Sequence, residues 1–292
     1  MFTQFFGNYL LNNRLVEPAQ LAEALSALKT TRVKLGVLAI NAGYMTAEQV
    51  EKVHAEQQRM DKRIGEIAVA MGFMTNAQVD ELFSAQSGSH LLLGQALVDR
   101  GYMSNSDFEA ALNAYKAENS ISDSDFKEND NEKIHNVIKS FYNFENDSDE
   151  LMVEYIDLLF KNIVRFIGDD FTPLNCERVD TYKFSNASIQ KISGVFAHTI
   201  AVDAEDKAYI GFASRYAGEE LTAVDEMADA SAGEFLNLHN GLFAVNVSND
   251  RNTELTLEPQ VVVHNETRDG LNGAYKIPLA FPFGVVTFVI GG

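Results

Sequence analysis

Two polar side chains that could do chemistry stand three residues apart in the stretch GEFLNLHNG, residues 233–241. Glu234 offers a carboxylate, and Asn237 offers a carboxamide that both donates and accepts hydrogen bonds. Residues three apart share one face of a helix, so the two groups would stand side by side. Such a pair could hold a water molecule or a partner's cation. It is equally the polar edge expected of an ordinary amphipathic helix.

Other catalytic arrangements are missing from the sequence. The single cysteine, Cys176, excludes an internal disulfide and a cysteine-based metal site, and we expect it to be a small buried residue near a strand. No two histidines stand four apart beside a carboxylate, as in a helical zinc site. Neither a phosphate-binding loop nor a nucleophile elbow is present. We therefore predict no metal site.

Composition and charge narrow the class of protein. The chain has 292 residues, 46% of them hydrophobic, which is enough for two domains with real cores. Its net charge of −19 argues against binding to nucleic acid polymers, which depends on lysine and arginine. The first residues lack the pattern of a signal peptide, and no run of about 18 apolar residues occurs. We expect a cytoplasmic protein without a membrane span.

The two polar residues must be positioned by a helix, which we expect over about residues 218–243. At 100° per residue, Glu234 and Asn237 fall on one flank, beside the apolar stripe. Small residues, Ala223, Ala230 and Gly241, share that flank and would let another chain approach. The stripe expected to face the core consists of Val224, Met227, Ala228, Ser231, Phe235, Leu238 and Leu242.

The surrounding segment, residues 148–292, reads as one domain of helix and sheet. Helical spacing from residue 148 to 168 predicts a first helix. Residues 193–214 hold two alternating runs joined by residues 203–207, which predicts a hairpin of two strands. Further strands are expected at 242–249, 254–265 and 274–291. We predict an α/β domain with a largely antiparallel sheet.

The stretch DASAGEFLNLHNG, residues 229–241, resembles the Glu-x-x-Asn motif of the CheC/CheX family of chemotaxis phosphatases, and it occurs once, as in CheX. The resemblance implies hydrolysis of the aspartyl phosphate of a CheY-type receiver domain. Asn237 would hold the attacking water, and Glu234 would pair with a receiver lysine. It also implies no cofactor of the protein's own and Mg²⁺ on the partner receiver. A homodimer through this domain is an open alternative to a monomer.

The chain departs from that family pattern beside the motif. Leu242 follows Gly241 where many relatives have asparagine, and only residues 214–223 separate the second expected strand from the motif helix. His239 and Asn240 interrupt what is often an apolar run. We expect these differences to reshape the docking surface or the dimer edge.

An internal repeat occupies residues 1–116. Gly7, Gly36, Gly65 and Gly94 are each 29 residues apart, and Gly43, Gly72 and Gly101 follow seven residues later. The second glycine of a copy suits the left-handed position after a helix. Thr46, Thr75 and Ser104 then suit helix N-caps, with Gln49, Gln78 and Asp107 completing capping boxes. We predict four helix pairs that stack into an all-helical array.

The repeat resembles the N-terminal domain of the GspE/MshE-type secretion and pilus ATPases, in which some tandem motifs bind cyclic di-GMP. The resemblance marks Lys34, Gly36, Arg63, Gly65 and Gln86 as nucleotide contacts. Lys34 replaces the family's arginine, and copies one and four lack the basic residue. A protein-docking helical module is the alternative reading.

The predicted organisation is thus an α+β protein of two domains, 1–116 and 148–292. Residues 117–147 form an acidic polar linker that contains one short amphipathic helix around Ile134, Val137, Ile138 and Phe141. The leading hypothesis is a CheX-like phosphatase in two-component signalling. The alternative is a non-enzymatic adaptor or a cyclic di-GMP sensor.

Overall fold

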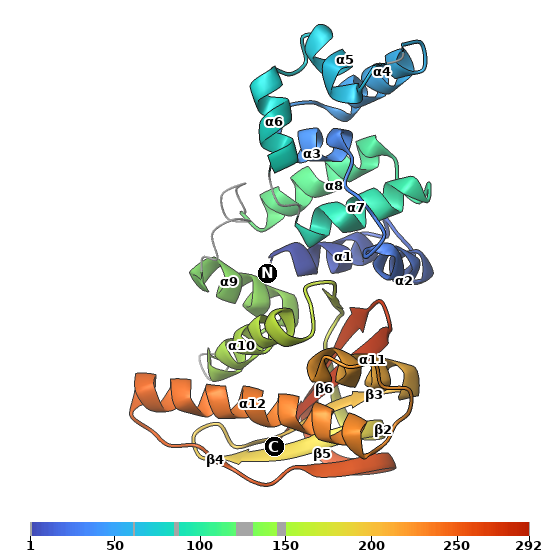
Figure 1. The fold of residues 1–292 in the computed structure, drawn as a ribbon. Coiled ribbons are helices and arrows are strands. Elements are labelled where there is room, and N and C mark those ends of the chain that lie inside the picture. The colour runs from blue at the N-terminus through green and yellow to red at the C-terminus, as the bar shows by residue number, and fades with distance from the viewer. Residues whose placement is uncertain (1, 61, 85–87, 121–130, 145–149, 292) are drawn as a thin grey trace. The chain divides into compact units, whose positions relative to one another are not determined.

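A computed structural model describes residues 2–60, 62–84, 88–120, 131–144 and 150–291 (Figure 1). The chain forms two compact units, Phe2–Asn129 and Asp130–Gly292. Across the described ranges, every helix is too short or too polar to cross a membrane. Each unit is described separately below.

The first unit contains eight helices in its described residues. The expected caps are confirmed, because Thr46 and Ser104 each form a capping box and Thr75 exchanges hydrogen bonds with Gln78. The second glycines adopt positive φ, as expected of residues that end a helix. The helices are α1 (Phe2–Asn12), α2 (Pro18–Ala27), α3 (Leu35–Asn41), α4 (Ala47–Gln57), α5 (Ile64–Ala70), α6 (Asn76–Ser84), α7 (Ser89–Asp99) and α8 (Asn105–Glu118).

The predicted array would require the helix pairs to stack on one another in the order of the chain. The helices of the first unit do not pack in that order. Helix α7 packs against α1, α2 and α3, while α8 packs against α1, α3 and α4. The backbone NH of Ala47 donates to Glu109 at 2.6 Å, and the Asn105 amide donates to Glu51 at 2.7 Å. Each of these four residues has its counterpart 58 residues away, twice the repeat length. The contacts between α4 and α8 are therefore reciprocal, as in a pseudo-twofold arrangement.

The first glycine of a copy allows two helices to pack closely. A Cβ atom at Gly94 would lie 2.3 Å from the ring of Phe108, so α7 can approach α8 only with glycine at this position. The Phe108 ring also packs edge-on against Phe6 in α1, with centroids 6.2 Å apart. These aromatic residues are buried and form part of the core of the first unit.

The second unit consists of four helices and six strands in its described residues. All strand pairings are antiparallel, in the order β1-β5-β6-β3-β2-β4, and β5 also pairs with β2. The four long strands therefore form a closed cycle of pairings. The elements are α9 (Asn131–Tyr142), α10 (Glu150–Phe166), β1 (Thr172–Pro173), β2 (Glu177–Ser193), β3 (His198–Ala204), α11 (Asp206–Ala217), α12 (Glu226–Arg251), β4 (Thr256–Leu257), β5 (Val261–Phe281) and β6 (Gly284–Gly291).

Strand β2 directs alternate residues to opposite faces of the sheet. Ala187 and Ile189 join an apolar cluster on one face with Val263, the partner of Ala187 on β5. Gln190 points to the other face, where its side chain reaches helix α12. The sheet thus carries an apolar cluster on one face and supports α12 on the other.

The hairpin expected at residues 193–214 is wrong in its second half. Residues 206–217 form helix α11, which buries Ala208, Tyr209, Phe212 and Ala213. That spacing follows a helical face, and Gly218 ends the helix at a φ of 71°. The turn of the true hairpin lies earlier, between Ser193 and His198, where β2 and β3 pair.

The motif helix lies later in the chain than expected. Helix α12 runs from Glu226 to Arg251, so residues 242–249, expected as a strand, are its last turns. The expected core stripe is also partly wrong, because Met227 is 54% exposed and Leu242 is 39% exposed. Residues buried instead include Ala232, Leu236, His239, Asn240, Phe243 and Val247.

A helix within the expected linker belongs to the second unit. Helix α9 packs against α10, where the His135 ring contacts the carboxylate of Asp157 at 3.1 Å. The ring of Tyr142 lies 6.5 Å from that of Phe160, and the ring of Phe144 lies 5.0 Å from that of Tyr275. Its apolar face is therefore covered within this unit.

Candidate functional site

Helix α12 carries Glu234 about two turns and Asn237 about three turns from its N-terminus. Asp225 caps this end, because its carboxylate accepts hydrogen bonds from the backbone NH groups of Met227 and Ala228. The helix continues for 26 residues and ends at Asn252, which adopts a left-handed conformation. A long, capped helix therefore fixes the backbone positions of both residues.

Glu234 and Asn237 lie on one edge of this helix. Glu234 is exposed and Asn237 is partly exposed. Ala230 and Gly241 lie on the same edge, and a side chain at Gly241 would meet open space. Ala223, which was expected on this flank, precedes the helix. The edge therefore has the low profile that would let another chain approach.

A chain of hydrogen bonds lies beneath Asn237. The Gln190 Nε2 atom donates to Asn237 Oδ1 and to the backbone carbonyl of Glu258, each at 2.9 Å. Gln190 Oε1 accepts from Asn240 Nδ2 at 2.8 Å. Asn240 Oδ1 in turn accepts from the Tyr155 hydroxyl at 2.7 Å. One end of this buried network reaches the exposed edge of α12 at Asn237.

His239 and Asn240 do not reshape a docking surface, contrary to expectation. Both are fully buried, at 0% exposure, and point toward α10 and the sheet. His239 Nδ1 lies 3.0 Å from the Asn162 amide, and its ring packs on Tyr155. Burial lowers the pKa of His239 to about 3, so the ring is neutral at physiological pH.

An acidic groove of about 530 Å³ runs beside Glu234. Two of its carboxylates already have partners, because Asp225 caps α12 and Asp229 contacts Tyr209 and His264. Among the described residues, Glu234 has no hydrogen bond or ion pair. The groove is lined by Ser188, Asp225, Glu226, Asp229, Ala230, Gly233, Glu234, Gln260 and Val262.

The carboxylate of Glu234 also acts on a neighbouring tyrosine. Burial raises the pKa of Tyr216 in α11, and the negative charge of Glu234 raises it further. The Tyr216 ring packs edge-on against Phe235, with centroids 5.8 Å apart. Helices α11 and α12 thus jointly form the surroundings of Glu234.

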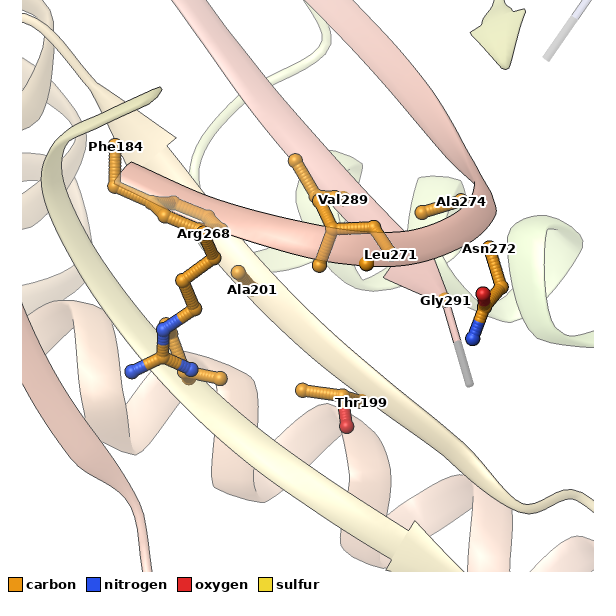
Figure 2. Close-up of a pocket in the computed structure, with 11 residues that line it drawn as sticks. Phe184, Thr199, Ala201, Arg268, Leu271, Asn272, Ala274, Val289 and Gly291 are labelled. Atoms are coloured by element: carbon orange, nitrogen blue, oxygen red, sulfur yellow. The ribbon is translucent and has the colours of Figure 1, made fainter. Parts of the chain in front are cut away.

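A second pocket lies at the apolar face of the sheet and shares no residue with the groove (Figure 2). Leu271, Ala274 and Val289 line it, with Arg268 and Asn272 as polar neighbours. The Arg268 guanidinium is paired with Glu266 at 2.6 Å. The face on which Ile189 lies is opposite to that of Gln190, so this pocket is separated from Asn237 by the sheet.

The residues expected to contact a nucleotide in the first unit have other contacts. The Lys34 ammonium pairs with Asp99 at 2.6 Å. A Cβ atom at Gly36 would lie 2.7 Å from Val50, and one at Gly65 would lie 3.0 Å from Val79, so both glycines serve helix packing. Arg63 is exposed just before α5. Gln86 lies outside the described residues.

Metal and nucleophile candidates are few. No group of three or more His, Cys, Asp or Glu residues in the described ranges is arranged to hold a metal ion. Burial raises the pKa of Cys176, which is partly exposed just before β2, to about 11. The thiol is therefore protonated at neutral pH and a poor nucleophile.

Sequence reasoning missed the residues that support Asn237. Gln190 lies among other polar residues of β2, such as Ser188 and Lys191, so its residue type alone gave no signal of a buried polar contact. Asn240 follows Asn237 by three residues and so lies on a neighbouring part of the helix surface. The sequence could not show that Gln190 and Asn240, which are 50 residues apart, form a hydrogen bond of 2.8 Å.

Comparison with known proteins gives structural similarities only. No protein-family model matches the chain, and no curated protein matches it. A CheC-like superfamily protein from Shewanella sp. PV-4 is similar at 16% identity and a TM-score of 0.43, over 50% of this chain and 97% of that one. The chemotaxis protein CheX from Vibrio vulnificus is 12% identical, with a TM-score of 0.42, over 49% and 98%.

A third similar structure contains a partner. It is the CheX-CheY-BeF3-Mg²⁺ complex from Borrelia burgdorferi, at 16% identity and a TM-score of 0.39, over 49% of this chain and 97% of that one.

Proposed function

We propose that the second unit is a phosphatase for the aspartyl phosphate of a CheY-type receiver domain in chemotaxis signalling. The observation that carries the proposal is the fixed carboxamide of Asn237, held by Gln190 at 2.9 Å beside the unpaired carboxylate of Glu234. The Glu-x-x-Asn motif is the sequence feature that directs the proposal to this substrate. The open, low edge of α12 leaves room for a folded partner.

The proposed reaction is hydrolysis of an acyl phosphate. A water oxygen forms a bond to phosphorus, the bond from phosphorus to the aspartyl oxygen breaks, and its electron pair leaves with the carboxylate. The proton from water ends on inorganic phosphate or in solvent. Asn237 orients the water through its carboxamide without adding a negative charge near the phosphoryl group. Positioning of this kind requires no nucleophile from this chain.

Glu234 is proposed to dock the partner through a lysine side chain. Its exposed carboxylate on the edge of α12 is available to such a cation. The Mg²⁺ ion that accompanies the phosphoryl group is assigned to the receiver, whose acidic residues are its natural oxygen ligands. It is part of the substrate in this proposal.

The first unit is proposed to act as an adaptor that brings the phosphatase to its site of action. Because Lys34, Gly36 and Gly65 make contacts within the unit, cyclic di-GMP binding gains no support from them. That alternative and homodimerisation through the second unit stay predictions.

The decay of a phosphorylated receiver, measured with and without the full chain, tests the proposal. We expect Asn237→Ala to lower kcat on the order of 10²-fold, because the water is no longer oriented. Glu234→Ala should mainly raise KM, by about fivefold, since a partly exposed ion pair contributes about 1 kcal/mol.

Asn246→Ala is the matched control, because Asn246 is an exposed asparagine on the same helix, more than two turns beyond Asn237. It should behave as the wild type. The catalytic proposal is wrong if the chain accelerates the dephosphorylation of no receiver encoded in its genome. It is also wrong if Asn237→Ala and Asn246→Ala have the same kcat.

A further inference from the structure

We infer that Gln190 is a positioning residue that fixes which way the Asn237 carboxamide faces. This inference rests on the proposed function and extends it from α12 to strand β2. Gln190 is 2% exposed, and both ends of its carboxamide have hydrogen-bond partners. The contact between Gln190 and Asn237 is the only hydrogen bond of the Asn237 side chain among the described residues.

The direction of the hydrogen bonds is set by the backbone. The carbonyl oxygen of Glu258 can only accept, so the Gln190 atom facing it at 2.9 Å must be Nε2. Gln190 Oε1 then faces Asn240, which must present its Nδ2 atom. Asn240 Oδ1 is thereby turned toward the Tyr155 hydroxyl, which donates to it. The assignment is consistent at every contact.

The same logic fixes Asn237. The second hydrogen on Gln190 Nε2 points to Asn237 at 2.9 Å, so Asn237 must present Oδ1 there. A flipped carboxamide would place two NH₂ groups against each other, so the hydrogen of each group that faces the other would have no acceptor. Asn237 therefore keeps its Nδ2 donor and one lone pair of Oδ1 for a water or a phosphoryl oxygen.

The backbone anchor is itself held firmly to β2. The Glu258 NH donates to the Lys191 carbonyl at 2.9 Å, and the Lys191 ammonium pairs with the Glu258 carboxylate at 3.2 Å. Glu258, whose carbonyl orients Gln190, is thus held against the strand residue that follows Gln190. The carboxamide of Asn237 is set by the sheet as well as by its own helix.

Gln190→Leu tests the inference, because leucine fills similar space and cannot donate. We expect kcat to fall on the order of 10²-fold with little change in KM, as for loss of orientation alone. Gln190→Glu should be equally impaired. Its carboxylate can still accept from Asn240, but it would turn Asn237 around to present Nδ2 inward.

Asn162→Leu is the control for general damage to the buried layer. It removes the 3.0 Å contact with His239 on the same helix, and it should keep kcat near the wild-type value. The side-chain amide NMR signals of Asn237, identified with Asn237→Ala, give a readout without catalysis. They should shift in Gln190→Leu and stay in place in Asn162→Leu.

Two results would overturn the inference. One is a kcat for Gln190→Leu no lower than that for Asn162→Leu, and the other is unchanged Asn237 amide signals in Gln190→Leu. If the wild-type chain hydrolyses no phosphorylated receiver, the proposed function fails, whereas the NMR comparison still decides whether Gln190 orients Asn237.

Discussion

At the scale of single residues, His239 stands out because a titratable ring is fully buried behind the candidate site. Its Nδ1 atom contacts Asn162, and its Nε2 atom has no hydrogen-bond partner in the described part of the chain. Burial lowers its pKa to about 3, well below the value of about 6.5 for an unfolded chain. The folded state therefore excludes a proton that the unfolded state binds in mild acid.

This difference makes the free energy of unfolding depend on pH. The contribution of a neutral His239 is fully present above about pH 6.5 and is lost as the pH falls toward 3, by about 1.4 kcal/mol per pH unit. The glutamine of His239→Gln cannot titrate and can still accept a hydrogen bond from Asn162. Between pH 7 and 5.5, the free energy of unfolding of this variant should fall by about 1 kcal/mol less than that of the wild type. Urea unfolding followed through NMR signals of α12 measures this, and equal losses in both proteins would contradict it.

The sequence identified Glu234 and Asn237 as neighbours on one edge of a helix, because helical geometry is local. It did not identify Gln190 or Asn240 as their support. Those contacts depend on how β2 passes beneath α12, and Gln190 and Asn237 are 47 residues apart in the chain. A single sequence does not indicate which polar residues, far apart in the chain, form hydrogen bonds with each other.

At the scale of elements, helix packing in the first unit depends on the small size of Gly94. A methyl group there would come within 2.3 Å of Phe108, which is itself buried between helices. The glycine therefore sets the distance between α7 and α8. No backbone requirement competes with this explanation, since Gly94 lies inside a regular helix.

Gly94→Ala should destabilise the first unit by about 1–3 kcal/mol, because the methyl group overpacks a closed contact. Phe108→Leu in the same chain should recover part of that loss by making room. Gly43→Asn is the control, since Gly43 has open space around it and asparagine tolerates positive φ. The urea midpoint of the first unit is the measurement. Equal midpoints for Gly94→Ala and Gly43→Asn would argue against the packing role.

Elements were predicted well where a local signal marks both ends. The caps at Thr46, Thr75 and Ser104 are such signals, and the structure confirms them. Helix α11 was missed because short apolar runs such as residues 208–213 fit a strand or a helix. Contacts with the rest of the unit favour the helix. For example, the ring of Phe212 packs against that of Phe235, with centroids 5.0 Å apart.

At the scale of the whole molecule, the boundary of the second unit lies before α9. The periodic residues of this helix were visible in the sequence, but its packing partner was not. The ring contacts of Tyr142 with Phe160 and of Phe144 with Tyr275 show that α9 and Phe144 are part of this unit. A chain that begins at residue 148 would lack those contacts.

We expect a fragment of residues 130–292 to be more stable than one of residues 148–292 by about 3 kcal/mol or more. Burial of one large aromatic side chain contributes about 1.5–3 kcal/mol, and the shorter fragment loses two. Urea unfolding of both fragments, followed by circular dichroism, checks this. Equal midpoints would mean that α9 contributes nothing to the unit.

The reciprocal contacts between α4 and α8 have a consequence for the internal symmetry of the first unit. The hydrogen bonds Ala47 to Glu109 and Asn105 to Glu51 join the same two repeat positions in opposite directions, the first through a backbone NH and the second through a side-chain amide. Helix α3 with α6, and α7 with α2, repeat the relation. This is the symmetry of a two-chain assembly of identical subunits. In these contacts the two 58-residue halves of the first unit are therefore related to each other as the two subunits of a homodimer are.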